Sequence, residues 1–439
     1  METARITVIG AGYVGLVTGV CLANSGHDVT CVDVDAAKIE MLSSGSSPIY
    51  EPGIVELLAK TSASGRLRFA TPQDGWAPLL GDIVFVAVGT PMAESGAADL
   101  TAVREVVQTV AATTDHPFTL VMKSTVPPGT GRDLVSRFLD DSPHPIGYVS
   151  NPEFLREGRA LEDWYHTDRV VLGSDDPSAL DAVEALYEEV DATVLRTDIA
   201  SAETIKYASN AFLATKISFI NEIANVCDAA GARIDDVSVG VGLDSRIGPQ
   251  FLNAGIGYGG SCFPKDVRAL DFISSESGYS FELVKAVIEV NARQRTLPVD
   301  ALRRTLGDLS GARIAVLGLT FKPDTDDVRE SPAIDIIASL VAEGASVLAY
   351  DPLASHVILP EGASRVDDAW TALTGANAVV LVTEWSEFVG LDWTRAAAAM
   401  AAPKIVFDGR NALDANALEA AGVRYMAVGR DGCHRRHDH

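Results

Sequence analysis

The sequence predicts an α/β fold made of two Rossmann-like, doubly wound domains, joined by a long central helix with a helical dimerisation region. Three observations lead to this fold class. A strand, a glycine turn, a helix and a second strand open the chain, the same order returns more faintly after Gly311, and the longest helical pattern lies between them. We therefore expect a Rossmann domain over residues 1–199, a helical part over 200–300 and a second Rossmann-like domain over 301–439.

The first element is a βαβ opening. An apolar strand over residues 5–9 runs into Gly10-Ala-Gly12-Tyr13-Val14-Gly15, a helix follows, and the next strand ends at Asp33. Glycines let the backbone approach a pyrophosphate at the helix N-terminus, and the acid accepts hydrogen bonds from a ribose. Because an acid there repels a 2′-phosphate, the pattern predicts NAD rather than NADP, against the alternative of a structural glycine turn.

Two further apolar strands follow, over residues 82–88 and 119–122. The first ends in Gly89-Thr90-Pro91 and the second in Lys123-Ser-Thr125. Small polar residues of this kind are expected at the carboxyl edge of a parallel sheet, where ligands bind.

An acidic segment follows at Asn151-Pro-Glu153-Phe-Leu-Arg-Glu157-Gly158. Its two acids, four residues apart beside a prolyl turn, are candidates for a general base and a cofactor contact. The alternative is a solvated acidic loop.

The longest helical pattern runs from Ala200 to about Gly231. Such a helix commonly bridges two lobes or packs against its own copy in a dimer. Lys206 and Asn210 lie four residues apart and therefore project from one face. An ammonium beside a carboxamide suits a developing alkoxide, whereas the alternative is a snorkelling lysine beside a surface asparagine.

The segment Gly257-Tyr-Gly-Gly-Ser-Cys262-Phe-Pro264-Lys265-Asp266 precedes a further helical pattern. Pro264 suits the first helical turn, which places Cys262 just before the helix. Exposed N–H groups and a nearby lysine, Lys265 or Lys206, lower the pKa of a thiol in that position, so the pattern predicts a nucleophilic thiolate.

The C-terminal half repeats the α/β order without the three-glycine turn. A strand at 313–317 leads into Gly318, a helix is expected over 333–342, and the strand 346–349 precedes Asp351. This pattern predicts a domain that binds a nucleotide-like ligand but no second NAD, against the alternative of a structural domain. Lys322 and Arg329 follow the first of these strands, where cations meet phosphates, although a charged surface loop has the same pattern.

Composition excludes some classes of function. The 35 Lys+Arg against 60 Asp+Glu leave a net charge of −25, which argues against broad binding to nucleic acid or anionic lipid. The start resembles no signal peptide, and no apolar run is long enough to span a bilayer, so we expect a cytoplasmic protein with no membrane or nucleic-acid partner.

The five cysteines are scattered, which indicates neither disulfides nor a zinc knuckle. Cys21, Cys31 and Cys227 are expected to be buried filler. The tail from Gly432 to His439, which includes Cys433, is rich in histidine, but a terminal run without partner ligands is typical of frayed chain, so we expect no metal.

Several long motifs stand in a fixed order from Ile6 to about Arg410. They are GAGYVG, KSTVPPGT, NPEFLREG, SAETIKYASNAFLATKISFINE, DSRIG, FLNAGIGYGGSCFPKD, GLTFKPDTDDVRESP and DGRN. Together they resemble the UDP-glucose/GDP-mannose dehydrogenase family. The resemblance implies NAD-dependent four-electron oxidation of UDP-glucose at C6 to UDP-glucuronate, through a thiohemiacetal and a thioester on Cys262, and a UDP-sugar site in the C-terminal domain.

The resemblance also implies roles for individual residues. Lys206 and Asn210 stabilise the oxygen at C6, Asp266 and Thr125 organise the catalytic water and the proton transfers, and Glu153 assists hydrolysis of the thioester. The group that removes the first alcohol proton stays open between Lys206 and a water held by Thr125 and Asp266. The cofactor set is Gly10, Gly12, Tyr13, Val14, Gly15, Asp33, Lys38, Thr90, Thr125, Glu157, Lys265 and Arg329. The substrate set is Glu153, Phe154, Leu155, Lys206, Asn210, Arg246, Phe251, Leu252, Asn253, Ala254, Gly255, Gly259, Lys322 and Arg410.

Arg246 matches a residue that reaches into the partner subunit's site, which implies a homodimer or a higher homo-oligomer. Three rival functions are kept. They are the oxidation of GDP-mannose, the oxidation of UDP-N-acetylmannosamine, and a silent sensor of NAD or nucleotide sugars. The nucleophile pattern around Cys262 argues against the sensor, because a sensor needs the pocket but not the thiol.

Overall fold

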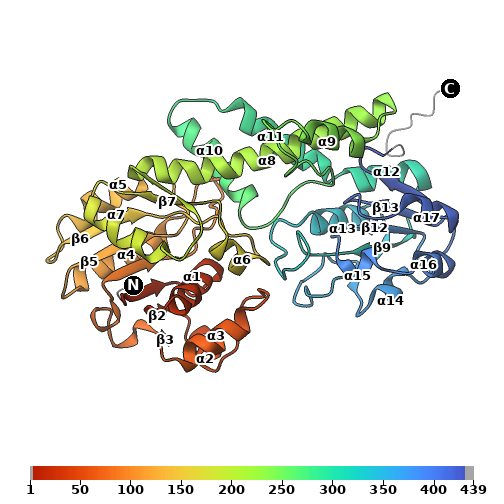
Figure 1. The fold of residues 1–439 in the computed structure, drawn as a ribbon. Coiled ribbons are helices and arrows are strands. Elements are labelled where there is room, and N and C mark those ends of the chain that lie inside the picture. Colours follow the sequence, from red (N-terminus) through yellow and green to blue (C-terminus); the bar gives the residue numbers. More distant parts are fainter. Residues whose placement is uncertain (1–2, 431–439) are drawn as a thin grey trace. The chain divides into compact units, whose positions relative to one another are not determined.

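The computed structural model describes residues 3–430, which form two compact units that meet inside one helix, between Ser209 and Asn210. Each unit contains one β-sheet with helices around it (Figure 1). The predicted α/β class, with two Rossmann-like sheets and a long central helix, is confirmed. The three-part division at 199/200 and 300/301 stays a prediction.

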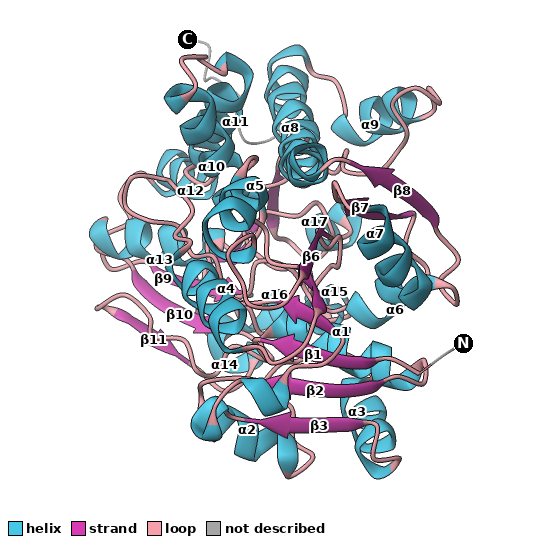
Figure 2. Cartoon of the chain, turned by 90° about the vertical axis from the view of Figure 1, so that its left-hand side faces the viewer, coloured by secondary structure: helices cyan, strands magenta, loops and turns pink. Residues whose placement is uncertain are grey.

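The first unit contains an eight-stranded sheet. Its order is β3-β2-β1-β4-β5-β6-β7-β8, and the pairs are parallel except β6 with β7. Figure 2 shows β1, β2 and β3 side by side at one end. The strands are β1 (Arg5–Ile9), β2 (Asp28–Val32), β3 (Leu67–Ala70), β4 (Ile83–Val86), β5 (Phe118–Met122), β6 (Ile146–Ser150), β7 (Arg169–Gly173) and β8 (Thr193–Thr197). The order reverses between β1 and β4, and this switch point is where a doubly wound sheet binds its ligand.

Both faces of this sheet are buried. Ile83 and Phe85 of β4 belong to one apolar core, whereas Val84 and Val86 belong to another. Strand side chains alternate between faces, so a sheet covered on both sides needs apolar residues at every position, which explains the unbroken apolar runs in the sequence. The helices of this unit are α1 (Tyr13–Asn24), α2 (Ala36–Ser43), α3 (Ile54–Ala63), η1 (Pro72–Asp74), η2 (Ala77–Leu79), α4 (Thr101–Thr113), α5 (Thr130–Leu134), η3 (Val135–Leu139), α6 (Ala160–Tyr165), α7 (Pro177–Glu184) and η4 (Ala185–Tyr187).

The second unit contains a six-stranded parallel sheet of order β11-β10-β9-β12-β13-β14. Its strands are β9 (Arg313–Leu317), β10 (Ser346–Tyr350), β11 (Ala363–Arg365), β12 (Ala378–Leu381), β13 (Ile405–Asp408) and β14 (Arg424–Ala427). Ile314 and Val316 of β9 enter one core, while Ala315 and Leu317 enter another, so this sheet is also covered on both faces.

The helices of the second unit are α9 (Ile234–Gly242), α10 (Phe263–Glu276), α11 (Glu282–Gln294), α12 (Leu297–Leu306), α13 (Pro332–Ala342), α14 (Ala369–Leu373), α15 (Ser386–Val389), α16 (Trp393–Ala399) and α17 (Ala415–Ala420). The predicted strand at 313–317 is confirmed, and the helix predicted over 333–342 begins one residue earlier.

Helix α8 (Ile199–Ala230) is the predicted long helix, and the boundary between the units falls within it. It ends before Gly231, whose φ of +74° suits a residue without a side chain. Within residues 3–430, no helix has the length and apolar character needed to cross a bilayer.

Glu203 of α8 is a buried carboxylate that anchors the turn before α5. Its oxygens accept hydrogen bonds from the backbone N–H groups of Gly129, at 2.6 Å, and Gly131, at 2.7 Å. Burial raises the pKa of Glu203 to about 7, although the two backbone hydrogen bonds and Arg132 act in the opposite direction. The turn therefore depends on a group that titrates near neutral pH.

This raised pKa predicts a pH dependence of stability. The folded-state pKa of Glu203 lies above its ordinary value of 4.5, so its contribution is fully present below pH 4.5 and is lost as the pH rises through about 7. The loss amounts to at most about 3 kcal/mol. In Glu203→Gln, thermal unfolding followed across this range should show a flatter decline than in the unmodified chain. Equal slopes in both proteins would contradict the assignment.

Candidate functional site

The glycine turn after β1 leaves room for a ligand at the start of α1. Gly10 has a φ of +98°, and a Cβ on Gly15 would lie 1.8 Å from the Gly10 carbonyl oxygen. At Gly12, by contrast, a Cβ would meet no atom within 4 Å, and α1 begins without a side-chain cap. Gly10 and Gly15 therefore allow the tight turn, while Gly12 keeps open space above the N–H groups that begin the helix.

Asp33 closes β2 beside this turn. Its Oδ2 accepts hydrogen bonds from the Ala11 backbone N–H, at 2.9 Å, and from Lys38 Nζ, at 2.8 Å. Burial acts to raise the pKa of Asp33, but the hydrogen bonds from Lys38, Asp35 and Ala11 outweigh it, so the pKa lies below its ordinary value. The carboxylate is therefore ionised at neutral pH. Together with the open turn, this arrangement fits the pyrophosphate and ribose of a dinucleotide.

Gly15→Ala should impair this turn directly, because the new Cβ would overlap backbone atoms that cannot move away cheaply. We expect a loss of about 1–3 kcal/mol in stability and at least about tenfold weaker NAD binding. Gly12→Ala is the matched variant. Its Cβ has free space in the protein, so it should weaken NAD binding with little change in the melting temperature. Calorimetric titration with NAD and thermal unfolding check both, and unchanged NAD affinity in Gly12→Ala would contradict the placement.

The loops after β4 and β5 lie at the same edge of the sheet, as predicted. Thr90 Oγ1 donates to the Thr125 carbonyl oxygen at 3.0 Å, and Ser124 Oγ donates to the Val88 carbonyl oxygen at 2.7 Å. Thr90 and Thr125 are thus held at the edge at which α1 begins.

Glu51 joins two predicted cofactor segments and was not recognised in the sequence. Its side chain pairs with the Tyr13 hydroxyl, and the Gly158 backbone N–H donates to Glu51 Oε2 at 2.8 Å and to the Tyr13 oxygen at 2.7 Å. Glu51 is 5% exposed. The glycine turn and the loop that carries Glu157, which is half-buried, are therefore fastened to one buried carboxylate.

Glu153 and Lys206 form a buried ion pair in the first unit. Lys206 Nζ lies 2.8 Å from both Glu153 Oε1 and the Glu153 carbonyl oxygen, and the Leu155 N–H donates to Glu153 Oε2 at 2.6 Å. Burial would raise the pKa of Glu153, but the charge of Lys206 and its hydrogen bond hold it below its ordinary value. Phe154 lies beside the pair, with Lys206 Nζ 5.4 Å from its ring centroid. Glu153 is thus buried and paired, whereas Glu157 is half-buried, so the segment is not the fully solvated loop that was the alternative.

Cys262 occupies the N-cap position of α10, with Pro264 in the first turn, as predicted. The thiol is half-buried, and Ser261 Oγ lies 3.6 Å from its sulfur. Exposed N–H groups at a helix start favour the thiolate, which is the nucleophilic form of cysteine. Cys21, Cys31 and Cys227 are free and buried, in agreement with their predicted role as filler.

Asp266, one turn into α10, is 1% exposed and holds two predicted site residues. Its Oδ1 lies 2.5 Å from Lys265 Nζ, and its Oδ2 accepts a hydrogen bond from Asn210 Nδ2 at 2.6 Å. The structure thereby connects the helix that begins at the thiol with Asn210 of α8, although the two residues are 56 positions apart.

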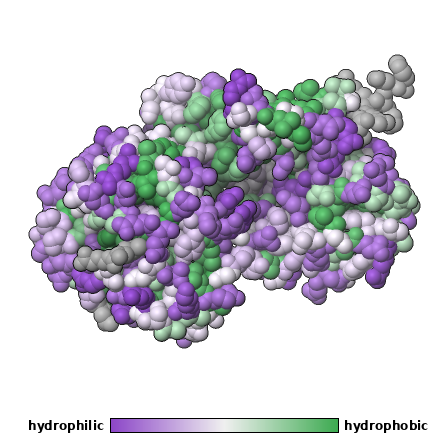
Figure 3. Space-filling model, viewed as in Figure 1, coloured by the Kyte–Doolittle hydropathy of each residue, from purple (hydrophilic) through white to green (hydrophobic). Residues whose placement is uncertain are grey.

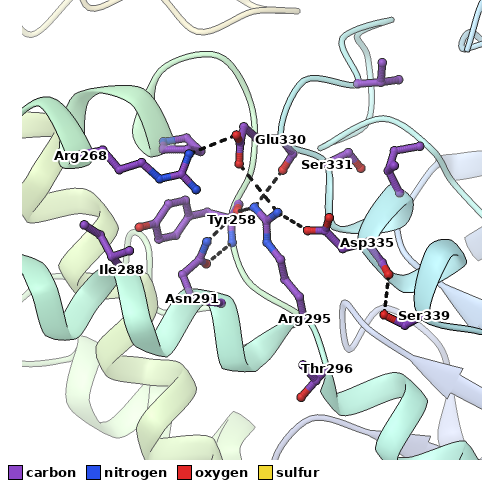
Figure 4. A pocket seen from close by; sticks show the side chains of 14 residues that line it. Tyr258, Arg268, Ile288, Asn291, Arg295, Thr296, Glu330, Ser331, Asp335 and Ser339 are labelled. Atoms are coloured by element: carbon purple, nitrogen blue, oxygen red, sulfur yellow. Dashed lines mark hydrogen bonds and ion pairs between the residues drawn. The ribbon is translucent and has the colours of Figure 1, made fainter. Parts of the chain in front are cut away.

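The glycine segment before Cys262 is tied to the loop that carries Arg329. Arg295 Nη2 donates to the carbonyl oxygens of Tyr258 and Glu330, both at 2.9 Å, and its Nη1 lies 2.6 Å from Asp335 Oδ2. Figure 4 shows these groups lining a cavity of about 680 Å³. The charged side chains that line it form the ion pairs Arg268–Glu330 and Arg295–Asp335. These pairs hold the loop in place, and the cavity lining does not identify a ligand.

The remaining predicted substrate residues of this segment are mostly packed. Phe251 adopts a φ of +62°, and its ring packs against that of Phe263 with 6.1 Å between centroids and an angle of 58° between the planes. A Cβ on Gly259 would lie 2.3 Å from the Glu330 carbonyl oxygen, and one on Gly255 would lie 2.8 Å from the Gly409 carbonyl oxygen. Leu252, Ala254, Gly255 and Gly259 are buried, and Asn253 is exposed.

Three predicted cations of the second unit have different surroundings. Lys322 Nζ lies 5.5 Å from the centroid of the Phe321 ring, and exposed Arg329 pairs with Asp327 at 2.8 Å. Arg410 donates to the carbonyl oxygens of Val382, Gly257 and Phe321 at 2.6, 3.0 and 3.2 Å. Arg410 therefore holds three loops together as well as contributing positive charge.

Asp351 stands after β10 as Asp33 stands after β2, but its oxygens are occupied. They accept hydrogen bonds from the backbone N–H groups of Leu319, Thr320, Leu353 and Ala354 and from the side chains of Thr320 and Trp385. A Cβ on Gly318 would lie 2.4 Å from Thr383, so this turn is packed against protein. The turn beside Asp351 is therefore closed by protein, unlike the turn at Gly12, and the expectation of no second NAD stays a prediction.

Arg246 lies in the loop after α9 and is 86% exposed, with Asp244 at 2.6 Å. In the part of the chain that the structure describes, no cluster of three or more His, Cys, Asp or Glu side chains is placed to hold a metal ion. The histidine-rich tail with Cys433 lies outside the described residues.

Comparison with known proteins gives the same family along the whole chain. The NAD binding domain of the UDP-glucose/GDP-mannose dehydrogenase family matches residues 4–191, its central domain 200–293 and its UDP binding domain 315–415. UDP-glucose 6-dehydrogenase YwqF of Bacillus subtilis (strain 168) is 48% identical over 433 residues, which cover 97% of this chain and 98% of that protein.

Solved structures agree. A UDP-glucose dehydrogenase from Pyrobaculum islandicum superimposes with a TM-score of 0.90 at 38% identity, covering 98% of both chains. A UDP-D-ManNAc dehydrogenase from Pyrococcus horikoshii gives 0.87 at 27% identity, covering 97% of this chain and 99% of that one. With three matching domains and close relatives over almost its full length, the chain belongs to the UDP-glucose/GDP-mannose dehydrogenase family, a family of NAD-dependent enzymes.

Proposed function

We propose that this chain is a UDP-glucose 6-dehydrogenase, which oxidises the C6 alcohol of UDP-glucose to the carboxylate of UDP-glucuronate with two NAD⁺. The observation that carries the proposal is Cys262 at the start of α10, one turn before buried Asp266, which holds Lys265 and Asn210. A dehydrogenase that stops at the aldehyde needs no such thiol. The relatives named for UDP-glucose share 48% and 38% identity with this chain, which supports the choice of sugar nucleotide.

Most of the proposed cofactor-binding residues belong to the first unit, and Lys265 and Arg329 belong to the second. Gly10, Gly12 and Gly15 with the start of α1 accept the pyrophosphate, Asp33 accepts the ribose hydroxyls, and Tyr13, Val14, Lys38, Thr90, Thr125, Glu157, Lys265 and Arg329 complete the set. Bound NAD⁺ supplies the hydride acceptor for each of the two oxidations.

In the first step, Lys206 and Asn210 donate hydrogen bonds to the C6 oxygen as it gains negative charge. The proton leaves either to Lys206, whose neutral amine thereby becomes the donating ammonium, or to a water held by Thr125 and Asp266. Oxidation of the alkoxide yields an aldehyde at C6. An ammonium and an amide that are already oriented stabilise this charge without reorganising, which lowers the barrier.

In the second step, the Cys262 thiolate adds to the aldehyde and forms a thiohemiacetal, whose oxidation leaves a thioester. Water then adds to the thioester carbon, with Glu153 accepting its proton, and the C–S bond breaks to release the carboxylate and restore the thiol. The covalent bond keeps the aldehyde from escaping between the two oxidations.

The sugar nucleotide is proposed to contact the segment Phe251 to Gly255, Gly259, Phe154 and Leu155, with Lys322 and Arg410 facing its diphosphate. GDP-mannose and UDP-N-acetylmannosamine remain the rival substrates. The lower identity of 27% to the UDP-D-ManNAc enzyme favours UDP-glucose. The thiol, Lys206 and Asn210 argue against a silent sensor, because binding alone requires none of them.

We further propose a homodimer or higher homo-oligomer. Three apolar side chains of α8 at intervals of seven residues are more than half exposed, namely Phe212, Phe219 and Val226, and Val239 and Leu243 of the following segment are 65% and 80% exposed. Hydrophobic residues gather over α8 and α9 in Figure 3. Such a stripe is typical of a surface that a second copy covers, and Arg246 lies next to it in the sequence. A cytoplasmic location is part of the proposal, since a catalytic thiol requires a reducing compartment.

The test is the number of NADH formed for each sugar consumed, with limiting UDP-glucose, GDP-mannose or UDP-N-acetylmannosamine in separate reactions. Two NADH for each UDP-glucose, with the other sugars inert, is the expected result. One NADH would replace the proposal with a simple alcohol dehydrogenase. No NADH with any of the three would favour the sensor.

A further inference from the structure

Lys123 is a buried lysine that the mechanism above does not use. It directly follows β5, and it is 5% exposed. Its Nζ donates to Asn151 Oδ1 at 3.0 Å and to the Tyr187 hydroxyl at 3.3 Å, and it lies 5.7 and 5.8 Å from the ring centroids of Trp164 and Tyr187. Moving an ammonium out of water is costly, so a lysine persists here only if its charge or its hydrogen bonds contribute something that an apolar side chain could not.

The contacts of Lys123 lead to the proposed hydrolytic group. Asn151, which accepts from Lys123, also accepts from the Tyr187 hydroxyl at 2.6 Å and donates to the Val171 carbonyl oxygen at 2.9 Å. Only Pro152 separates Asn151 from Glu153, and Asn151 and Glu153 are 1% and 6% exposed. Lys123 therefore fixes the start of the turn from which Glu153 projects.

Two buried lysines, Lys206 and Lys123, act on the carboxylate of Glu153. Lys206 pairs directly with Glu153, while Lys123 acts on Glu153 from farther away and is repelled by Lys206. Burial lowers the pKa of Lys123 to about 8, so it is mainly protonated at pH 7. Both buried lysines thus act on one carboxylate and favour its ionised form.

We propose that Lys123 is a positioning residue for Glu153, holding the Asn151–Glu153 turn in place and supplying the second positive charge that keeps Glu153 ionised during hydrolysis of the thioester. The inference rests on the proposed function, in which Glu153 accepts the proton of the attacking water. It explains why the core between α6, η4 and the end of β5 contains a lysine although a methionine would fill the same space between the two rings.

The charged and titratable groups around this site come from several elements. Glu153 is faced by Lys206 of α8, by Lys123 after β5 and by the Leu155 N–H. Lys123 is also faced by Tyr187 of η4. Arg169 of β7 lies over the neighbouring Phe154 ring, 3.9 Å from its centroid. Burial raises the pKa of Tyr187, so this hydroxyl stays neutral. Without Lys123, Glu153 loses one of the two lysines that oppose its protonation. The acid limb of the pH–rate profile for hydrolysis should therefore move to higher pH.

The experiment compares Lys123→Met, which removes charge and hydrogen bonds, with Lys123→Gln, which removes the charge but can still donate to Asn151. Single-turnover reactions with UDP-glucose are followed by NADH absorbance and by the intact mass of the protein, which detects an adduct on Cys262, from about pH 4 to 8. We expect the acid limb of hydrolysis to move up by about one pH unit in both variants, so that on this limb hydrolysis slows about tenfold and a thioester-sized adduct accumulates. Formation of the first NADH and the KM for NAD should stay within about twofold, because neither depends on Glu153 as a base.

Tyr187→Phe is the matched control. It removes the hydroxyl that also donates to Asn151, without changing the charge of the cluster, and it should leave the acid limb in place. If Lys123→Gln and Lys123→Met hydrolyse the thioester with the wild-type rate and pH profile, or if Tyr187→Phe reproduces their shift, the inference is wrong. If Lys123→Met does not fold, as judged by circular dichroism, the comparison of Lys123→Gln with Tyr187→Phe is sufficient to test the inference. Failure of the proposed function is seen separately, because the unmodified enzyme would then not form two NADH.

Discussion

Cys262→Ala should abolish formation of UDP-glucuronate while leaving the binding of NAD and UDP-glucose within about twofold. The thiol is half-buried at the start of α10, and the cap of this helix makes no side-chain hydrogen bond that alanine would remove. Removal of a catalytic nucleophile lowers turnover by at least about 1,000-fold, since binding and oxyanion stabilisation cannot replace the covalent step. Product chromatography and calorimetric titration of the ligands measure the two effects.

The control for this prediction is Cys227→Ala, which removes a buried thiol from the core of the second unit. It should cost some stability, as truncations in a core do, and should leave two NADH per sugar. Acid formation by Cys262→Ala at the normal rate would rule out the thioester. Loss of ligand binding in Cys262→Ala, together with an unchanged melting temperature, would show that the thiol contributes to binding.

Glu153→Gln should slow hydrolysis of the thioester by about 100- to 10,000-fold, the usual contribution of a general base. Glutamine keeps the shape of the side chain and an acceptor oxygen for Lys206 Nζ, which lies 2.8 Å from Glu153 Oε1, but it cannot take a proton from water. The sugar nucleotide should therefore accumulate on Cys262, where intact mass spectrometry detects it.

Because this change also breaks a buried ion pair, the melting temperature has to be measured beside the rate. Glu162→Gln is the matched control, since it neutralises an exposed acid of α6 that pairs with Arg159. Rapid turnover of Glu153→Gln without an adduct would remove Glu153 from the hydrolytic step. An adduct that also appears in Glu162→Gln would indicate a general effect of lost negative charge.

Local patterns were sufficient for the elements around the site. The strand at Arg5–Ile9, the turn at Gly10 and the helix that begins after Cys262 were predicted from neighbouring residues, and the structure confirms them. The physical reason is that a short apolar run, the backbone freedom of glycine and the preference of proline for a first helical turn act over a few positions. The same signals predicted that Thr90 and Thr125 stand at the edge of one sheet.

Tertiary structure alone decided which charged groups became buried and with whom. The sequence around Glu51, Lys123 and Glu203 did not indicate that they would be buried. Glu51 meets Tyr13 and Gly158, Lys123 meets Asn151 and Tyr187, and Glu203 meets the N–H groups of Gly129 and Gly131. A carboxylate or ammonium changes its pKa only when folding removes its water and brings such distant groups to it.

The two aspartates that follow the second strand of each sheet also separate what the sequence determined from what the folded chain decided. Asp33 and Asp351 occupy equivalent places in the βαβ pattern, and the sequence by itself determined that each ends a strand beside a glycine turn. Only the folded chain decided that Asp351 is enclosed by protein donors, including Trp385 from 34 residues away, whereas Asp33 stands beside an open turn. The difference arises because hydrogen-bond donors reach a carboxylate through space, and their distance along the chain carries no information about that approach.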